Sequence, residues 1–181
     1  FAFGNGVISA MIALAILPYF ESLFKITTNQ TLLELSNLNH PLLKRLMMNA
    51  PGTYQHSLMV ANLSEAAAEA IKANPILCRV CSYFHDIGKL KRPVFFTENQ
   101  LTEDSPHTNL SPRISKMIIL SHVKDGYEMG VKYKLPSIIL DCILEHHGTS
   151  LLSVFYSKAL AKEGEEVSHD DEAMCNNGKP H

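Results

Sequence analysis

Apolar and polar positions along most of the chain follow the spacing of amphipathic helices. After residue 20, the text ESLFKITTNQTLLELSNLNHPLLKRLMM and the segments that follow repeat apolar side chains every three or four positions. Alternation of apolar and polar residues, which would indicate a half-buried strand, is absent from the sequence. The pattern therefore predicts an all-α fold, a bundle of helices.

Prolines, glycines and capping residues divide this pattern into separate helices. Breaks are expected at residues 39–41, where a proline follows asparagine and histidine, and at residues 51–52, where a proline precedes a glycine. Thr53 is a candidate N-cap for a helix from about residue 54 to residue 73. Pro75 then predicts the first turn of a second helix.

The second helix is followed by a long irregular stretch. We expect that helix to end near residues 85–86, with Gly88 as its stop. Residues 91–110, KRPVFFTENQLTEDSPHTNL, show no helical pattern, and irregular stretches of this length inside a compact domain are usually functional. A serine and a proline at 111–112 predict the next helix start, with an end or a bend at 125–126.

A last helix and a polar tail complete the chain. The helix is predicted to begin at residues 135–136 and to end at the His-His-Gly sequence of 146–148. The tail, residues 161–181, is polar and acidic and has no apolar face to bury. It is therefore expected to be a loop or a linker.

The first twenty residues, FAFGNGVISAMIALAILPYF, carry no charged side chain and have about the length that spans a bilayer. They are interpreted as the last transmembrane helix of a longer protein, cut mid-chain. The alternative is a buried core helix, because four residues weaken the span: Gly4, Asn5, Gly6 and Pro18. The basic residues that follow place the next part of the chain in the cytoplasm by the positive-inside rule: Lys25, Lys44 and Arg45.

Composition narrows the functional classes. The chain has 181 residues, enough for one compact domain, and a net charge of −2 without a long basic run. This excludes the electrostatic footprint of a protein that binds duplex nucleic acid, while a small phosphorylated ligand remains open. The four cysteines are too few and too irregularly spaced for a disulfide scaffold, which favours a reducing compartment. Cys78 and Cys81 form a C-x-x-C without a second pair and are interpreted as core residues.

Histidines supply the candidate chemistry. Of the nine in the chain, five lie at helix ends or in helices that flank the irregular stretch: His56, His85, His122, His146 and His147. Together with Asp86 they provide six nitrogen and oxygen donors of the kind that borderline divalent metals prefer. A single histidine on an apolar helix is more often a satisfied core residue, and His40 and His107 are assigned to that class.

The adjacent pair His85 and Asp86 matters most in this set. At a helix end two neighbouring side chains can diverge toward two metal ions, and the carboxylate has two oxygens with which to bridge them. Two ions about 3.5–4 Å apart would hold a hydroxide that attacks a phosphoryl group. Lys89 follows directly and is placed to meet a phosphate oxygen as a point charge. The candidate catalytic residues are therefore His85, Asp86 and Lys89, with Lys89 also binding the substrate.

The order H…HD…H…HH resembles that of the HD-domain phosphohydrolases. Three longer strings, NAPGTYQHSLMVANLSEAAAEAI, FHDIGKLKRPVFFTENQ and EHHGTSLLSVFYSKAL, are similar to one branch of that group. This branch comprises seven-transmembrane receptors with a cytoplasmic HD domain that hydrolyse cyclic di-AMP. The branch that acts on cyclic di-GMP would carry Gly-Tyr-Pro after the histidine doublet, where this chain has Gly-Thr-Ser at 148–150.

The resemblance implies a division of the chain into four parts. Residues 1–20 would be the end of the last transmembrane helix, 21–52 a helical linker, 53–160 an HD-domain helical bundle without its final part, and 161–181 the acidic linker. It places the protein in a bacterial cell membrane, with the HD domain in the cytoplasm. A homodimer is left open.

The resemblance also implies two divalent metal ions, iron or manganese. One ion would take His56, His85 and Asp86, and the other would take Asp86, His122, His146 and His147. The family pattern adds an aspartate ligand to the first ion on a later helix, beyond residue 181. A bridging water would attack phosphorus and release the 3′ oxygen, giving 5′-pApA, with Lys89 at the phosphate and the FFTENQ stretch along the nucleotide.

Two other functions remain open at this stage. One is an HD phosphohydrolase of another nucleotide, such as a nucleoside monophosphate or a guanosine polyphosphate. The other is a sensor module that binds a cyclic dinucleotide without cleaving it. The six intact donor residues argue against the sensor, because binding alone does not need them all.

Overall fold

The computed structural model describes residues 2–24, 27–101 and 105–148, and within these ranges the chain is helical without β-strands. This confirms the predicted all-α fold. The α-helices are α1 (Ala2–Phe24), α2 (Asn29–Leu35), α3 (Pro41–Asn49), α4 (Pro51–Ala70), α5 (Pro75–Phe84), α6 (Pro112–Lys132) and α7 (Ser137–Glu145). Four short 3₁₀ helices lie between α5 and α6: η1 (Ile87–Lys91), η2 (Pro93–Phe95), η3 (Thr97–Asn99) and η4 (Pro106–Asn109).

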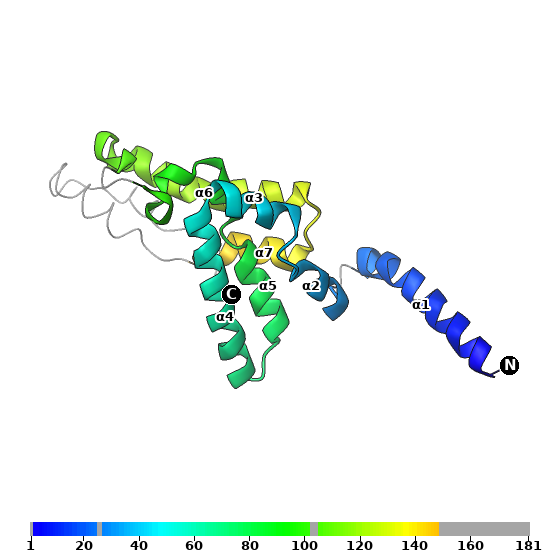
Figure 1. Cartoon of the computed structure of the whole chain (residues 1–181). Coiled ribbons are helices and arrows are strands. Elements are labelled where there is room, and N and C mark those ends of the chain that lie inside the picture. The colour runs from blue at the N-terminus through cyan, green and yellow to red at the C-terminus, as the bar shows by residue number, and fades with distance from the viewer. Residues whose placement is uncertain (1, 25–26, 102–104, 149–181) are drawn as a thin grey trace.

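Helices α2 to α7 pack around one hydrophobic core, and α4 and α5 lie side by side as a helical hairpin (Figure 1). The core contains the fully buried residues Leu42, Leu43, Leu46, Val80, Phe84, Ile87, Ile139 and Ile143. Phe84 and Ile87 are the immediate neighbours of the pair His85 and Asp86 in the chain. The core therefore anchors that pair on both sides.

Most predicted helix starts agree with the structure. Asn74 caps α5, accepting a hydrogen bond from the Leu77 amide at 3.1 Å, and Pro75 is the first helical residue. Ser111 caps α6 by accepting from the Ile114 amide at 3.3 Å. The predicted break at residues 39–41 is confirmed, and there the Nδ1 of His40 caps α3.

The prediction for the start and end of α4 was wrong. This helix begins at Pro51, with Ala50 as its N-cap, and ends at Ala70. A proline is well suited to the first helical position, because its fixed φ is helical and its missing amide proton has no helical partner there. Thr53 is therefore inside the first turn, where its side chain is fully buried and contacts a distant segment.

Two glycines allow η1 to lie directly against α6. The interpretation of Gly88 as a helix stop was wrong, because α5 ends at Phe84 and Gly88 lies within η1. A Cβ on Gly88 would lie 1.8 Å from the carbonyl oxygen of His122 and 2.6 Å from the amide nitrogen of Gly126. Of the end or bend expected at 125–126, the end was wrong, since α6 continues to Lys132, and the bend stays a prediction. Gly88 and Gly126 both allow the backbones of η1 and α6 to approach each other closely.

The irregular stretch that the sequence predicts between the second and third main helices contains η2, η3 and η4, each no longer than four residues. Residues 102–104 within it, and residues 149–181 after α7, lie outside the described residues. The expected acidic linker at 161–181 and the last part of the expected HD domain belong to this undescribed portion. The predicted domain boundaries stay predictions.

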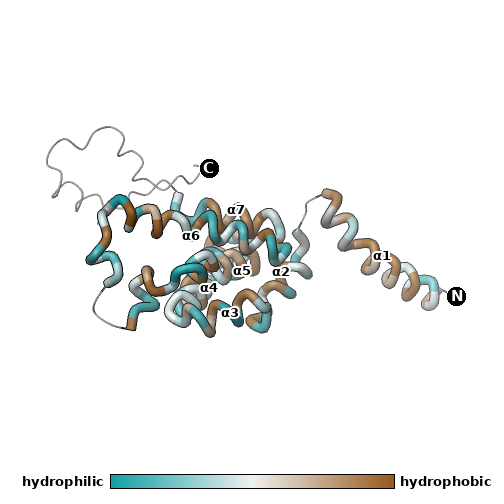
Figure 2. The backbone as a smooth tube through the Cα atoms, turned by 90° about the horizontal axis from the view of Figure 1, so that it is seen from above, coloured by the Kyte–Doolittle hydropathy of each residue, from teal (hydrophilic) through white to brown (hydrophobic). Residues whose placement is uncertain are grey.

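Helix α1 is apolar and extends away from the other helices (Figure 2). Its large side chains are exposed, with Phe3 at 87% and Met11 at 67% of their accessible surface, so the alternative of a buried core helix was wrong. Within the described residues, no helix combines the length and the apolar character needed to cross a membrane. The expected transmembrane helix at residues 1–20 is not confirmed.

We expect Gly88→Ala to destabilise the protein by about 2 kcal/mol or more, because the added methyl group would overlap two backbone atoms of α6 that cannot move independently. Gly6→Ala is the matched control, since nothing lies within 4 Å of its Cβ position and alanine favours the helix. Thermal unfolding followed by circular dichroism measures both effects. An unchanged midpoint for Gly88→Ala would contradict the close approach of η1 and α6.

Candidate metal centre

The six predicted ligands come from four helices and meet at one place. His56 lies on α4, His85 and Asp86 follow the last residue of α5, His122 lies on α6, and His146 and His147 follow the last residue of α7. Their donor atoms form two groups, in each of which all atoms lie within 4.8 Å of one another. The first group is Asp86, His122, His146 and His147, and the second is His56, His85 and Asp86. Asp86 belongs to both.

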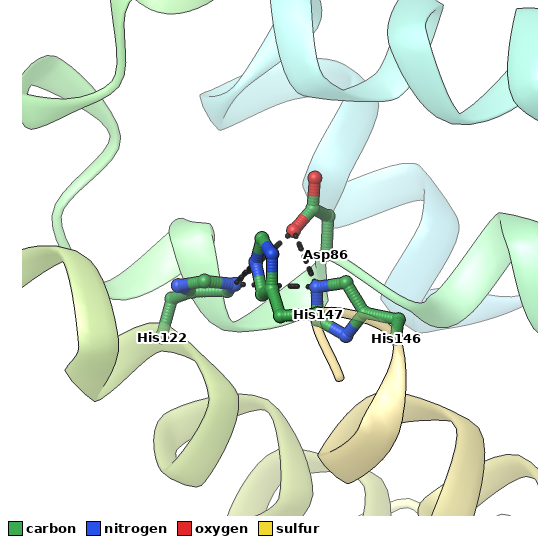
Figure 3. Close-up of side chains that lie close together, drawn as sticks. All are labelled: Asp86, His122, His146 and His147. Atoms are coloured by element: carbon green, nitrogen blue, oxygen red, sulfur yellow. Dashed lines mark hydrogen bonds and ion pairs between the residues drawn. The ribbon is translucent and has the colours of Figure 1, made fainter. Parts of the chain in front are cut away.

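The carboxylate of Asp86 belongs to both groups and is buried, with 3% of the residue exposed. Figure 3 shows it beside the three histidines of the first group. Its Oδ2 lies 3.1 Å from the Nε2 of His85 and 2.8 Å from the ammonium of Lys89. Its Oδ1 faces the Nε2 atoms of His122 and His146 at 3.4 and 3.6 Å. Oδ1 has no hydrogen-bond partner. Because an unpartnered buried carboxylate oxygen is costly, this atom fits a metal ion.

Three of the histidines are oriented by the carbonyl oxygen three residues earlier in the chain. The Nδ1 contacts are His85 to Ser82 at 2.8 Å, His146 to Ile143 at 2.9 Å, and His122 to Ile119. A carbonyl only accepts, so each Nδ1 carries the proton and donates it. When the ring is neutral, each Nε2 then presents a lone pair to the centre, and this is the form in which imidazole binds a metal.

The Nε2 atoms of the first group lie close to one another. The Nε2 of His122 lies 3.4 Å from that of His146 and 3.1 Å from that of His147. Two of these atoms, on His122 and His146, also face the carboxylate oxygen of Asp86. Because the Nδ1 protons of His122 and His146 go to backbone carbonyls, the Nε2 lone pairs of these two rings face each other and repel unless a cation lies between them. The donor set of the first group therefore fits a divalent metal ion.

Two histidines of the first group, His122 and His147, are kept neutral by their surroundings. Burial lowers the pKa of His122. Burial, followed by the nearby His146 and His122, lowers the pKa of His147 to about 4. At neutral pH both rings are therefore uncharged, and the uncharged ring is the form in which imidazole binds a metal.

In the second group, the pKa values of His85 and Asp86 are both shifted toward the charged forms. Burial acts to lower the pKa of His85, but the hydrogen bond and the negative charge of Asp86 outweigh it and raise the pKa. Burial acts to raise the pKa of Asp86, but contacts with His146 and His85 and the charge of Lys89 hold it well below its usual range. Asp86 is thus ionised, and it can bridge two cations.

The two groups differ in their access to solvent. His56 is exposed, and its ring centroid lies 5.6 Å from that of the half-buried His85. The second group offers two nitrogens and one oxygen, so an ion bound there would keep open positions for water or a substrate. The first group offers four donors and is more enclosed. The arrangement combines an enclosed position with an open one.

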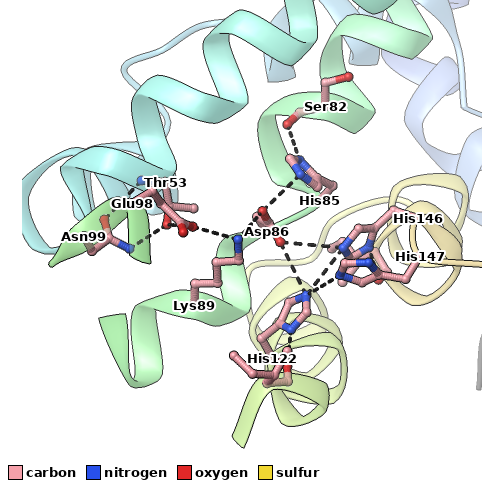
Figure 4. A network of polar contacts seen from close by, with 12 residues as sticks. Thr53, Ser82, His85, Asp86, Lys89, Glu98, Asn99, His122, His146 and His147 are labelled. Atoms are coloured by element: carbon pink, nitrogen blue, oxygen red, sulfur yellow. Dashed lines mark hydrogen bonds and ion pairs between the residues drawn. The ribbon is translucent and has the colours of Figure 1, made fainter. Parts of the chain in front are cut away.

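Lys89 lies beside Asp86, as its place in the sequence suggests, but it also binds a residue that the sequence analysis missed. Its ammonium lies 2.8 Å from Asp86 Oδ2 and 2.7 Å from Glu98 Oε1, and 5.0 Å from the ring centre of Phe96 (Figure 4). An ammonium has three N–H donors, so two carboxylates leave one for a phosphate oxygen. From the sequence, Glu98 belonged to the FFTENQ stretch expected along the nucleotide, and no role of its own was predicted for it.

The histidines and cysteines assigned to structural roles lie outside the two groups. His40 caps α3, and its ring makes an edge contact with Phe84 at 5.2 Å between centroids. The Nε2 of His107 lies 2.9 Å from the carbonyl oxygen of Phe95. Cys81 packs against the hydrophobic core. These contacts agree with the structural interpretation of the three residues.

Comparison with known proteins agrees with this arrangement. The family model named HD domain matches residues 53–175. The chain is 50% identical over 167 residues to the cyclic-di-AMP phosphodiesterase PgpH of Bacillus subtilis, covering 92% of this chain and 23% of that protein. It is 50% identical over 159 residues to PgpH of Listeria monocytogenes, covering 88% of this chain and 22% of that protein. The chain thus spans about a quarter of the length of these curated relatives.

A solved structure is similar over most of the described helices. The crystal structure of the L. monocytogenes PgpH HD domain in complex with cyclic di-AMP matches with a TM-score of 0.74 and 50% sequence identity. The match covers 79% of this chain and 65% of that chain. The likeness in fold and the likeness in sequence therefore refer to the same region.

We expect His146→Ala to lower the affinity for Mn²⁺ at least about tenfold, because it removes one of four donors from the enclosed group. Isothermal titration calorimetry on metal-stripped protein measures the affinity. His107→Ala is the control, since that ring contacts the backbone of Phe95 outside both groups. Equal affinities for His146→Ala and the wild type would contradict the assignment of this group as a metal site.

Proposed function

The chain belongs to the HD domain family, and from this premise we propose that it is a metal-dependent phosphodiesterase that hydrolyses cyclic di-AMP to 5′-pApA. The observation that carries the proposal is the carboxylate of Asp86, shared by two groups of nitrogen and oxygen donors. The names of the two PgpH relatives and of the crystallised complex support the choice of cyclic di-AMP.

The proposed ligands follow the two groups of donor atoms. His56, His85 and Asp86 would hold one divalent ion, and Asp86, His122, His146 and His147 would hold the other, with iron or manganese as the proposed metals. When bound, such ions would polarise the phosphodiester and lower the pKa of a bound water molecule, so that hydroxide is available as the nucleophile at neutral pH. The donor set suits borderline ions better than Ca²⁺, because imidazole nitrogens dominate it.

The remaining roles fall to the chain's own side chains. The pairing of each Nδ1 with a backbone carbonyl keeps His85, His122 and His146 in the metal-binding tautomer. Lys89, held positive beside Asp86, would donate to a phosphate oxygen and offset the negative charge that grows there as the 3′ oxygen leaves. Burial acts to lower the pKa of Lys89, but the charge of Asp86 outweighs it and raises the pKa.

Attachment to a bacterial cell membrane, with the HD domain on the cytoplasmic side, is a further part of the proposal. It is supported by the exposed apolar side chains of α1, among them Phe3, Met11 and Leu14. Flotation with lipid vesicles tests it. Recovery of the protein with the vesicles, lost when residues 2–24 are removed, is the expected result.

We expect Asp86→Ala to abolish the hydrolysis of cyclic di-AMP, because it removes the donor common to both groups. Lys89→Ala should leave a measurable residual activity, because it removes a phosphate contact and leaves all six metal donors in place. Chromatography of manganese-loaded protein incubated with cyclic di-AMP separates the substrate from 5′-pApA. Cyclic di-GMP serves as the competing substrate.

Asp141→Ala is the matched control, since it removes an exposed carboxylate from α7. It should keep the wild-type rate. Equal residual activity in Asp86→Ala and Lys89→Ala would contradict the bridging role of Asp86. Binding of cyclic di-AMP without turnover by metal-loaded wild type would indicate a sensor, and faster cleavage of another nucleotide would reassign the substrate.

A further inference from the structure

A chain of hydrogen bonds connects the first turn of α4 to the candidate metal centre (Figure 4). Asn99 Nδ2 donates to the hydroxyl oxygen of Thr53 at 2.7 Å, and the Thr53 amide donates to Asn99 Oδ1 at 3.1 Å. Because the threonine hydroxyl accepts from Asn99, its own proton is directed to Glu98 Oε1, at 3.0 Å. Thr53 and Asn99 together determine where the carboxylate of Glu98 lies.

The backbone of Glu98 is fixed as well. A Cβ on Gly52 would lie 1.7 Å from the carbonyl oxygen of Glu98, so η3 lies directly on the start of α4. Thr53, the next residue, is fully buried beneath it. The position of Glu98 therefore depends on tertiary contacts with α4 and does not depend on the flexibility of a surface loop.

Glu98 in turn fixes Lys89. Its Oε1 accepts from the ammonium at 2.7 Å, while Asp86 Oδ2 accepts at 2.8 Å. Burial acts to raise the pKa of Glu98, but the hydrogen bond and charge of Lys89 outweigh it and lower the pKa, so both partners are ionised. A lysine side chain has a flexible stem of four carbons, and a single contact would leave its ammonium able to adopt several positions. Two carboxylates hold the nitrogen at one point.

We propose that Glu98 is the positioning residue for Lys89. Braced by Thr53 and Asn99, it keeps the ammonium beside Asp86, so that the third N–H is presented to the phosphate of a substrate. This inference rests on the proposed function, in which Lys89 contacts that phosphate. Glu98 would act through Lys89 alone, and it is not one of the six metal donors.

A double-mutant cycle tests the dependence of Glu98 on Lys89. The variants are Glu98→Ala, Lys89→Met and the two combined, assayed with manganese and cyclic di-AMP. We expect Glu98→Ala to lower kcat by about tenfold to a hundredfold, the effect of losing a hydrogen bond to a charged group. In the Lys89→Met background the same substitution should have no further effect, and Mn²⁺ affinity should not fall in any of the variants.

Three companion variants separate positioning from general stability. Glu98→Gln keeps a hydrogen-bond acceptor and should recover part of the lost kcat. Gly52→Ala removes no polar group but should displace Glu98, and it should therefore reproduce the loss. Glu69→Ala is the control, because this exposed carboxylate lies about 24 Å along α4 from Thr53. Equal losses from Glu98→Ala with and without Lys89, or a fall in Mn²⁺ affinity, would overturn the proposal.

Crystal structures of wild type and Glu98→Ala give a readout that does not depend on the substrate. The expected result is a Lys89 ammonium that no longer lies within 4 Å of Asp86 in the variant. An ammonium that stays in place would overturn the positioning role, whatever the substrate is. A displaced ammonium in a protein whose wild type cleaves no dinucleotide would support the positioning role and overturn the proposed function.

Discussion

The candidate site is organised around one group, the buried and ionised carboxylate of Asp86. Asp86 lies two residues after Phe84, the last residue of α5. Its carboxylate faces four side chains: His85 just after α5, Lys89 on η1, His122 on α6 and His146 just after α7. Removing an ionised group from water is expensive unless partners surround it. The chain supplies such partners to one oxygen: Oδ2 contacts the ammonium of Lys89 and the ring of His85. Oδ1 faces the Nε2 atoms of His122 and His146 without a hydrogen bond, so its partner would be a metal ion.

The hydrophobic core and the close backbone contacts hold Asp86 and its partners in place. Phe84 and Ile87, both fully buried, prevent the segment between them from shifting along the helix axis. Gly88 and Gly126 permit η1 to lie against α6, and this brings His122 within reach of Asp86. Stability and the geometry of the candidate site thus depend on the same few contacts, and the site is as rigid as the core beneath it.

Four of the six ligands could be predicted from the sequence because they lie just after helix ends, which local signals locate: His85, Asp86, His146 and His147. His56 and His122 lie inside α4 and α6 and were predicted from their residue type. Pro75 and Ser111 illustrate such signals, and both were confirmed. Thr53 and Gly88 were misinterpreted because they satisfy local rules for caps and stops while serving contacts with residues that are distant in the chain. The role of Glu98 could not be predicted, since it depends on how η3 lies on α4.

The pairing of ring nitrogens with the carbonyl three residues earlier has a consequence for how this chain can vary in length. Each ligand is aimed by its own helix, and one inserted or deleted residue rotates every later side chain of that helix by about 100°. Such a change within the last turn of α5 or α7 would turn His85 or His146 away from the centre and break its carbonyl contact. We therefore expect natural relatives to differ in length between these helices and to conserve residue number within their final turns.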